Sequence, residues 1–256
     1  MRDDLVRRRV ELKHVFPEGK GEELRARIRA LRPGFAGRRL SGWVTTVYFD
    51  LPDRRLTRAA LERPEACLKV RLREYFSEDD APCSPFVWLE IKERDGARSA
   101  KRRFQLHKRM VGRFLAGELD LADALTCQEG SPDLSGVVES IQKLSDLAQG
   151  ELAPVGAVRY LRCSLQGGEP PARLTLDRRI AYHVGPLGLY DVHAALDAEA
   201  LGMPTLSDGA AVLEIKHAGA APPDWCARIA GDRAPSEYSK FVRLARLSLA
   251  EPSYVD

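Results

Sequence analysis

The stretch that most constrains the fold runs from Leu68 to Arg73, where aliphatic and cationic side chains alternate one for one. Successive side chains of a β-strand point to opposite faces, so Lys69, Arg71 and Arg73 share one face and the aliphatic residues the other. The aliphatic face suits a hydrophobic core. The other face holds three like charges that repel one another unless water or a polyanion lies against them. One such strand alone is typical of an antiparallel sheet with one solvated face.

The overall charge does not account for an affinity for anions. The 256 residues include 40 Lys and Arg against 37 Asp and Glu, a net charge of +3. Any anion site therefore depends on local clustering of cations. The hydrophobic content of 44% and the charged content of 30% are typical of a globular protein with enough apolar residues for a core.

The cysteines and the N-terminus indicate the compartment. Five widely spaced cysteines without a CxxC pair favour free thiols in a reducing environment. The first residues are charged and lack the apolar core of a signal peptide. No run approaches the roughly 18 apolar residues of a transmembrane helix, so the sequence predicts no membrane insertion. We therefore expect a cytoplasmic protein.

Hydrophobic periodicity predicts about eight strands and about four to six helices. The expected strands are Val6–Val15, Trp43–Asp50, Cys67–Phe76, Phe86–Glu93, Ser99–Leu106, Ala157–Leu165, Arg173–Ile180 and Ala211–His217. The expected helices include Glu22–Leu31, Pro222–Ile229 and a terminal helix over Ser236–Leu249 with Ser236 as its N-cap. Over residues 107–148 the apolar residues follow the spacing of short helices and not of strands. This pattern predicts a helical insertion that covers part of the sheet. Without a linker to divide the chain, we expect a single α+β domain over residues 1–256 with a large antiparallel sheet.

One tetrad, aliphatic–Glu–aliphatic–Lys, occurs three times in segments that read as strands. The copies are Val10-Glu11-Leu12-Lys13, Leu89-Glu90-Ile91-Lys92 and Leu213-Glu214-Ile215-Lys216. Each copy puts one carboxylate and one ammonium on the same strand face. Ion pairs across a solvated sheet are common and contribute little, so a single copy would indicate almost nothing. Three copies, each within a strand, favour a functional row of charges.

Further cations follow the same period of two on the segments around Arg103, Arg162 and Arg173. A flat sheet with one solvated face explains this pattern, and so does a closed barrel with a charged lumen, because closure turns one parity inward on every strand. The crowded cations of a barrel would require a multiply charged anion. The glutamates would then hold Mg²⁺ or Mn²⁺, which binds carboxylate and phosphate oxygens together. Such a lumen matches phosphoryl transfer, which depends on positioning and charge neutralisation.

At these residues the sequence resembles the VTC domain, a polyphosphate polymerase domain of the vacuolar transporter chaperone type. That family lies within the triphosphate tunnel metalloenzyme superfamily, which also contains the CYTH phosphatases. The matching segments, in the family's order over nearly the whole chain, are Glu11–Lys13, Lys69–Arg73, Leu89–Lys92, Lys101–Phe104, Arg159–Arg162, Arg173–Asp177, Val212–Lys216 and Ser239–Phe241. The resemblance implies a closed antiparallel β-barrel of about eight strands with peripheral helices, a tunnel whose basic residues bind triphosphate or polyphosphate.

The resemblance also implies roles for individual positions. The residues that would bind phosphates are Lys13, Arg71, Arg73, Lys92, Lys101, Arg162 and Arg173, with Lys240 closing over the phosphate chain from the start of the last helix. Further lining residues would be Lys69, Arg103, Lys216 and Ser239. Glu214 is the principal expected ligand for Mn²⁺ or Mg²⁺, and Glu11 and Glu90 either join it or hold neighbouring cations in position.

Two positions depart from the family pattern. His14 directly follows Lys13 of the first tetrad, where family members often have an aromatic residue. The resemblance therefore does not imply where a nucleotide would lie near this strand. Arg9 stands at the first acidic position of the ExExK motif that begins the phosphatase branch. The missing carboxylate favours the VTC branch over the hydrolase branch. Without an added membrane segment or lipid-binding module, we expect an isolated catalytic domain.

The sequence therefore predicts a metal-dependent enzyme that transfers the γ-phosphoryl group of ATP to a growing inorganic polyphosphate chain. None of the five histidines forms an HExxH motif or a triad-like set, and this transfer needs no protein nucleophile. The alternatives are a hydrolase of inorganic or nucleoside triphosphate on the same scaffold and a non-catalytic polyanion binder. Nucleic acid is not an expected partner, because the cations interleave with aliphatic residues and aromatics make up only 7%. The sequence leaves the oligomeric state open.

Overall fold

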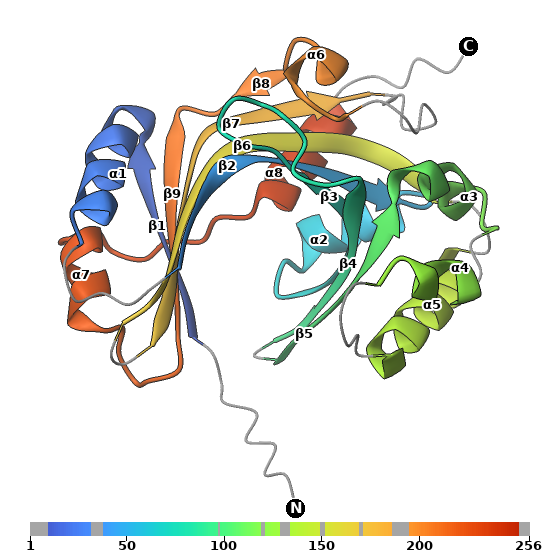
Figure 1. Cartoon of the computed structure of the whole chain (residues 1–256), viewed down its shortest axis with the longest axis horizontal. Coiled ribbons are helices and arrows are strands. Elements are labelled where there is room, and N and C mark those ends of the chain that lie inside the picture. Colours follow the sequence, from blue (N-terminus) through green and yellow to red (C-terminus); the bar gives the residue numbers. More distant parts are fainter. Residues whose placement is uncertain are drawn as a thin grey trace, which may run out of the picture. The chain divides into compact units, whose positions relative to one another are not determined.

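The computed structural model describes residues 10–31, 38–96, 98–118, 121–128, 134–148, 152–168, 171–185 and 195–250. Its strands are β1 (Val10–Pro17), β2 (Arg38–Asp50), β3 (Ala66–Tyr75), β4 (Phe86–Asp95), β5 (Arg98–His107), β6 (Ala153–Gly167), β7 (Ala172–Val184), β8 (Leu206–Ser207) and β9 (Ala210–His217) (Figure 1). Its helices are α1 (Gly21–Ala30), α2 (Arg55–Glu62), α3 (Val111–Leu115), α4 (Leu121–Thr126), α5 (Leu134–Ala148), α6 (Ala198–Leu201), α7 (Asp224–Ala230) and α8 (Lys240–Ala250), with 3-10 turns η1 (Glu18–Lys20) and η2 (Lys108–Met110).

The hydrogen-bonded order of the strands is β1-β9-β7-β6-β2-β3-β4-β5, and β8 pairs with β7. This order confirms an α+β fold with a large, mostly antiparallel sheet. The prediction of a closed barrel is wrong. Within the described part of the chain, β1 and β5 stand at the two ends of the order and the sheet is open.

Segments that are not strands occupy both outer edges, which explains why the ladder stops there. On β5, the backbone N–H and C=O of Gln105 bond to the side-chain amide of Gln128, which follows α4. On β1, the carbonyls of Lys13 and Val15 accept hydrogen bonds from the Ser236 N–H and the Arg233 side chain, both at 2.7 Å. These bonds satisfy edge groups that would otherwise pair with a further strand.

Contacts along the chain separate two compact units. The first unit contains Met1–Trp43, Tyr160–Ile180 and Ser207–Tyr238. The second unit contains Val44–Arg159, Ala181–Leu206 and Ser239–Asp256. The strands β2, β6 and β7 contribute residues to both units.

The core of the second unit follows the predicted alternation. The aliphatic face of β2–β5 includes Val47, Val70, Leu72, Leu89 and Ile91, all nearly or fully buried. Helices α3, α4 and α5 cover this face with Phe114, Ala124 and Val137, among others. These helices lie within residues 107–148 and beside β5 in Figure 1. The sheet therefore turns its aliphatic side toward the helices and its cationic side away from them.

A second core forms in the first unit. Alternate residues of β7 and β9, such as Leu174 and Leu213, are fully buried there. Leu24 and Ile28 of α1 pack against this core, as does Ile229 of α7. The apolar residues of α1 recur at helical spacing, which turns one face of the helix toward the sheet.

Helix α8 begins at Lys240, four residues after the expected N-cap. A capping residue directly precedes the helix, so Ser236 is too early in the chain to cap α8, and its backbone N–H is bonded to the Lys13 carbonyl. The hydroxyl of Ser239 instead accepts a hydrogen bond from the Val242 N–H at 3.3 Å. Phe241 stacks on Tyr48 of β2 at 4.9 Å, which places the start of α8 on the sheet face opposite the aliphatic core.

Two simpler expectations can be compared with the structure. None of the described helices is long and apolar enough to cross a membrane. The five cysteines, all within the described residues, are free thiols, and four of them are buried.

Candidate functional site

In the second unit, three cations surround one buried carboxylate on the face of β3–β5 that points away from the core. The register places Arg71 opposite Glu90, and Glu90 opposite Arg103. Oε2 of Glu90 lies 2.8 Å from Nε of Arg71 and 3.5 Å from Nε of Arg73. Oε1 lies 2.5 Å from Nζ of Lys101. We call Arg71, Arg73, Glu90 and Lys101 the Glu90 cluster; three cations and one carboxylate leave it with two excess positive charges.

The electrostatics of this cluster follow from burial and crowding. Burial by itself would raise the pKa of Glu90, but the charges of Arg73, Arg71 and Lys101 outweigh it and hold that pKa well below its usual range. Burial also lowers the pKa of Lys101 to about 8, helped by repulsion from Arg73 and Arg71 and opposed by attraction to Glu90. At neutral pH Glu90 is therefore ionised and Lys101 is mostly protonated.

A row of three lysines lies one step along the same face. Lys69 stands opposite Lys92, and Lys92 opposite Lys101. The Lys69 ammonium donates to the Ser239 hydroxyl at 3.3 Å and lies 5.5 Å from the centre of the Phe241 ring. The start of α8, where Lys240 is the first residue, is thus held near this lysine row. The structure thus brings together Lys69 and Ser239, two of the predicted lining residues.

Arg103 stands opposite Glu90 but takes a different partner. Its guanidinium lies over the indole of Trp88 at 4.3 Å from the ring centre. Trp88 is half-buried and stands on the same face as Glu90, two residues away along β4. A guanidinium stacked on an aromatic ring forms a cation–π contact.

The first unit holds a second cluster, in which two carboxylates share two lysines. Strands β1 and β9 pair so that Glu11 stands opposite Lys216, and Lys13 opposite Glu214. Glu11 lies 3.1 Å from the Lys13 ammonium and 3.2 Å from that of Lys216. Lys216 in turn lies 2.8 Å from Glu214. The Lys13 ammonium also donates to the carbonyl of Tyr238 at 3.0 Å. Glu11, Lys13, Glu214 and Lys216 are called the Glu214 cluster below.

Glu11 and Glu214 are the two carboxylates of the Glu214 cluster that could hold a divalent metal. Burial would raise the pKa of Glu214, but the charges of Lys216, Arg162 and Lys13 lower it, and repulsion from Glu11 opposes them. Lys216 contacts both carboxylates and so holds Glu11 and Glu214 close together. Among the described residues, no three His, Cys, Asp or Glu side chains gather as a complete metal cage. Mg²⁺ commonly uses one or two carboxylates and takes its remaining oxygens from water and phosphate.

Arg162 and Arg173 differ in how free they are to bind a ligand. Asp177 binds Arg162 at two points, at 2.6 Å and 2.7 Å, so its carboxylate already neutralises this guanidinium. Burial works against the charged form of Arg162, but Asp177 outweighs it and raises the pKa of Arg162. Arg173 is exposed and stands opposite Lys216. Arg173 therefore fits the expected role in phosphate binding more directly than Arg162 does.

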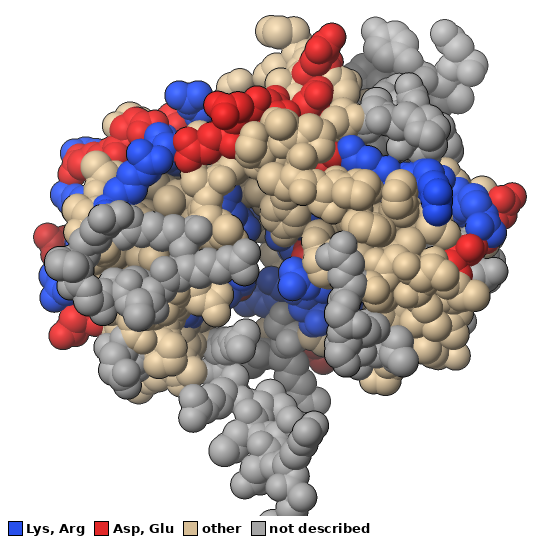
Figure 2. Space-filling model, viewed as in Figure 1, with Lys and Arg blue, Asp and Glu red and all other residues tan. Residues whose placement is uncertain are grey.

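The molecular surface elsewhere mixes charges of both signs. Over α1, at the upper left of Figure 2, cations and carboxylates lie side by side. Lys20 and Arg27 both pair with Glu23, at 2.9 Å and 2.5 Å, and Arg25 pairs with Glu22 at 3.5 Å. Ion pairs on a solvated surface contribute little. The Glu90 cluster differs in that its carboxylate is fully buried, and its Arg71 and Arg73 side chains are only 11% and 12% exposed.

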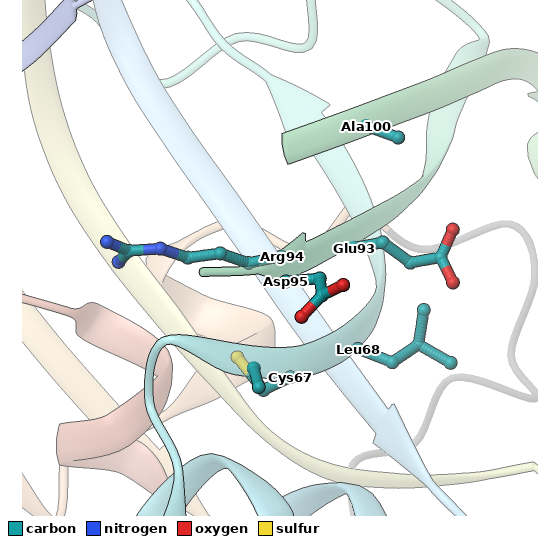
Figure 3. Close-up of a pocket in the computed structure, with 7 residues that line it drawn as sticks. Cys67, Leu68, Glu93, Arg94, Asp95 and Ala100 are labelled. Carbon is teal, nitrogen blue, oxygen red and sulfur yellow. The ribbon is translucent and has the colours of Figure 1, made fainter. Parts of the chain in front are cut away.

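An open pocket at the ends of β3–β5 lies outside both clusters (Figure 3). Its lining residues are Ala66, Cys67, Leu68, Glu93, Arg94, Asp95 and Ala100. Figure 3 shows Arg94 and Glu93 pointing to opposite sides of their strand, as alternation requires. With two carboxylates and one guanidinium, the pocket does not suit a polyanion.

Most predicted site residues fall into these two clusters and the lysine row. Two residues that contact predicted site residues, Trp88 and Asp177, were not predicted from the sequence. Strand parity contained the signal for Trp88, which is two residues before Glu90 on the same face. The pairing of Asp177 with Arg162 depends on which strands are neighbours, and sequence spacing does not reveal that.

Comparison with known proteins identifies the family. The sequence model of the VTC domain matches residues 8–246. "Vacuolar transporter chaperone complex subunit 4" of Schizosaccharomyces pombe is 25% identical over 229 residues, which cover 78% of this chain and 31% of that protein. The protein of the same name from Trypanosoma cruzi is 29% identical over 190 residues, 68% of this chain and 23% of that protein. The chain thus spans less than a third of the length of these curated relatives.

A solved structure supports the fold. A putative adenylate cyclase from Bacillus halodurans superposes with a TM-score of 0.50 at 14% identity, over 91% of this chain and 95% of that one. The match to the VTC domain extends over almost the whole chain and includes the strands that carry both clusters. This chain belongs to the VTC domain family.

Proposed function

We propose that this chain is a polyphosphate polymerase, which transfers the γ-phosphoryl group of ATP to the end of an inorganic polyphosphate chain. The observation that carries the proposal is the Glu90 cluster with its neighbouring lysine row, an array of partly desolvated cations on one sheet face. The like charges of such an array repel one another, and a multiply charged anion against them relieves this repulsion. The names of the curated relatives, subunits of a vacuolar transporter chaperone complex, are consistent with this proposal.

In the proposed reaction, a terminal oxygen of polyphosphate attacks the γ-phosphorus of ATP. The bond from that phosphorus to the β–γ bridging oxygen breaks, and ADP leaves with the bond's electrons. Both nucleophile and leaving group belong to substrates, so the protein has to position them and neutralise their charge. In the second unit, Arg71, Arg73, Lys92, Lys101 and Lys240 would bind phosphate oxygens. In the first unit, Lys13 and Arg173 would do so.

A divalent metal is part of the proposal. Glu214, with Glu11 beside it, would hold Mn²⁺ or Mg²⁺, which neutralises phosphate charge when bound. Glu90 is less suited to this role, because it is 0% exposed and three cations, Arg71, Arg73 and Lys101, already surround it. Lys216, between the two carboxylates of the Glu214 cluster, would hold them in place before the metal binds.

The experiment is incubation of the purified chain with ATP and Mn²⁺ or Mg²⁺, followed by ³¹P NMR and gel electrophoresis. The proposal requires signals of chain phosphates together with ADP. Lys92→Ala should lose this activity, whereas Lys143→Ala should keep it, because Lys143 of α5 pairs with Glu93 on the opposite face of the sheet. Release of free phosphate alone would identify a triphosphate hydrolase, and binding without turnover would identify a polyanion-binding protein. Either outcome would overturn the proposal.

A further inference from the structure

The face of β3–β5 that points away from the core changes in chemistry along the strands. One cross-strand row is made only of lysines, Lys69, Lys92 and Lys101. The next row contains Arg71, Glu90 and Arg103, and the row after that contains Arg73, Trp88 and Gln105. The face therefore passes from purely cationic to aromatic and polar within two steps along β4.

Trp88 is not a core residue. Its neighbours Val87 and Leu89 are 3% and 0% exposed and belong to the aliphatic core, so alternation puts Trp88 on the opposite face. The indole is half-buried there, and the Arg103 guanidinium lies 4.3 Å from its ring centre. An indole with a stacked guanidinium is the kind of platform on which proteins bind nucleobases, by stacking and by cation–π attraction.

We propose that Trp88, supported by Arg103, binds the base of a nucleoside triphosphate, and that the phosphates run along β4 toward Lys92 and Lys101. The inference deepens the proposed function and depends on it. Residues on one face of a strand recur every roughly 6.7 Å, so about 13 Å separate Trp88 from Lys92 along β4. Adenine and the γ-phosphate of an extended ATP are separated by a distance of this order. The γ-phosphate would then lie at the lysine row, and the acceptor chain would approach from that end.

The test distinguishes the contribution of the base to binding from that of the phosphates. Isothermal titration calorimetry measures the affinity of the whole chain for ATP and for inorganic tripolyphosphate, which has no base, in the same Mg²⁺ buffer. Trp88→Leu should weaken ATP binding about tenfold, which is the loss expected for one stacked base. The same variant should change tripolyphosphate binding by less than about twofold. Trp88→Phe keeps an aromatic ring and should bind ATP nearly as the wild type does.

The outcomes distinguish this inference from the proposed function. If the wild type binds neither ligand, the proposed function fails. Suppose that the wild type binds both ligands and that Trp88→Leu is folded. If this variant then binds both ligands more weakly by the same factor, or binds both as the wild type does, only the base platform is overturned. Should Trp88→Leu not fold, ¹⁹F NMR of the wild type labelled with 5-fluorotryptophan decides the question. Adenosine must then shift the Trp88 resonance, assigned with Trp88→Phe, and an unchanged resonance overturns the inference.

Discussion

The substitution Glu90→Gln tests most directly how the cationic face is held together. It removes one buried negative charge and keeps nearly the same shape. The guanidinium groups of Arg71 and Arg73 belong to side chains only 11% and 12% exposed, so they cannot move fully into water. Lys101, with 39% exposure, can regain part of its hydration. The variant therefore leaves two poorly hydrated cations without their carboxylate.

The expected loss of stability follows from this geometry. Removal of one partner from a buried ion pair typically lowers the free energy of unfolding by about 3–5 kcal/mol. Because Lys101 is partly exposed, the lower figure applies, about 3 kcal/mol. For a chain of this length, that loss corresponds to a decrease in Tm of roughly 6–12 °C.

Urea unfolding followed by circular dichroism at neutral pH measures the effect. The matched control is Glu93→Gln on the same strand, since Glu93 pairs with Arg102 and Lys143 on the other face with 39% of its side chain exposed. Exposed pairs contribute at most about 1 kcal/mol, so the control should stay close to the wild type. Equal stability of the two variants would refute the view that Glu90 neutralises buried cations.

Ligand and pH give two further checks on Glu90. Tripolyphosphate should stabilise Glu90→Gln more than the wild type, because the ligand supplies the missing negative charge. The folded-state pKa of Glu90 is lowered, so its contribution to stability is complete above the ordinary pKa of 4.5 and is lost as the pH falls below it. The difference in stability between wild type and variant should therefore shrink in acid. A difference that grows below that pH would contradict the assignment.

Three other predictions concern charge, packing and metal. Lys101 loses its proton as the pH rises through about 8, so the affinity for tripolyphosphate should fall between about pH 7 and about pH 9. In Lys101→Arg, which stays charged, the affinity should fall much less. Calorimetry that finds the same pH dependence of affinity in both proteins would contradict this prediction. Gly156→Ala places a Cβ atom 2.4 Å from the His183 carbonyl oxygen and should lower stability by more than about 2 kcal/mol, whereas Gly209→Ala, with no atom within 4 Å, should unfold at the wild-type Tm. Glu214→Gln should weaken Mn²⁺ binding measured by electron paramagnetic resonance, and unchanged binding would exclude Glu214 as the main ligand.

The sequence predicted the local features of the fold well. Alternation between Leu68 and Arg73 predicted strand β3, its buried aliphatic face and its cationic face. The same reasoning placed Glu90 and Lys101 on the charged faces of their strands, because parity assigns each residue of a strand to a face whatever its neighbours are. It failed for the start of α8. There Ser236 has the right chemistry for a cap, but the helix begins only at Lys240. The Ser236 segment is instead bonded through its backbone N–H to Lys13, more than 200 residues away in the sequence.

The sequence by itself therefore determined which side chains share a face, since alternation along a strand is a property of the local backbone. Only the tertiary structure decided which of those side chains meet. Glu90 gathers cations from three strands, and Arg162 is bound by Asp177, because strand order and register bring these residues together. The openness of the sheet was decided at the same level. At the sheet edges, Gln128 and Ser236 bond to the backbones of β5 and β1. Packing sets the positions of the segments that contain these two residues, and the residue alternation of the strands does not predict them.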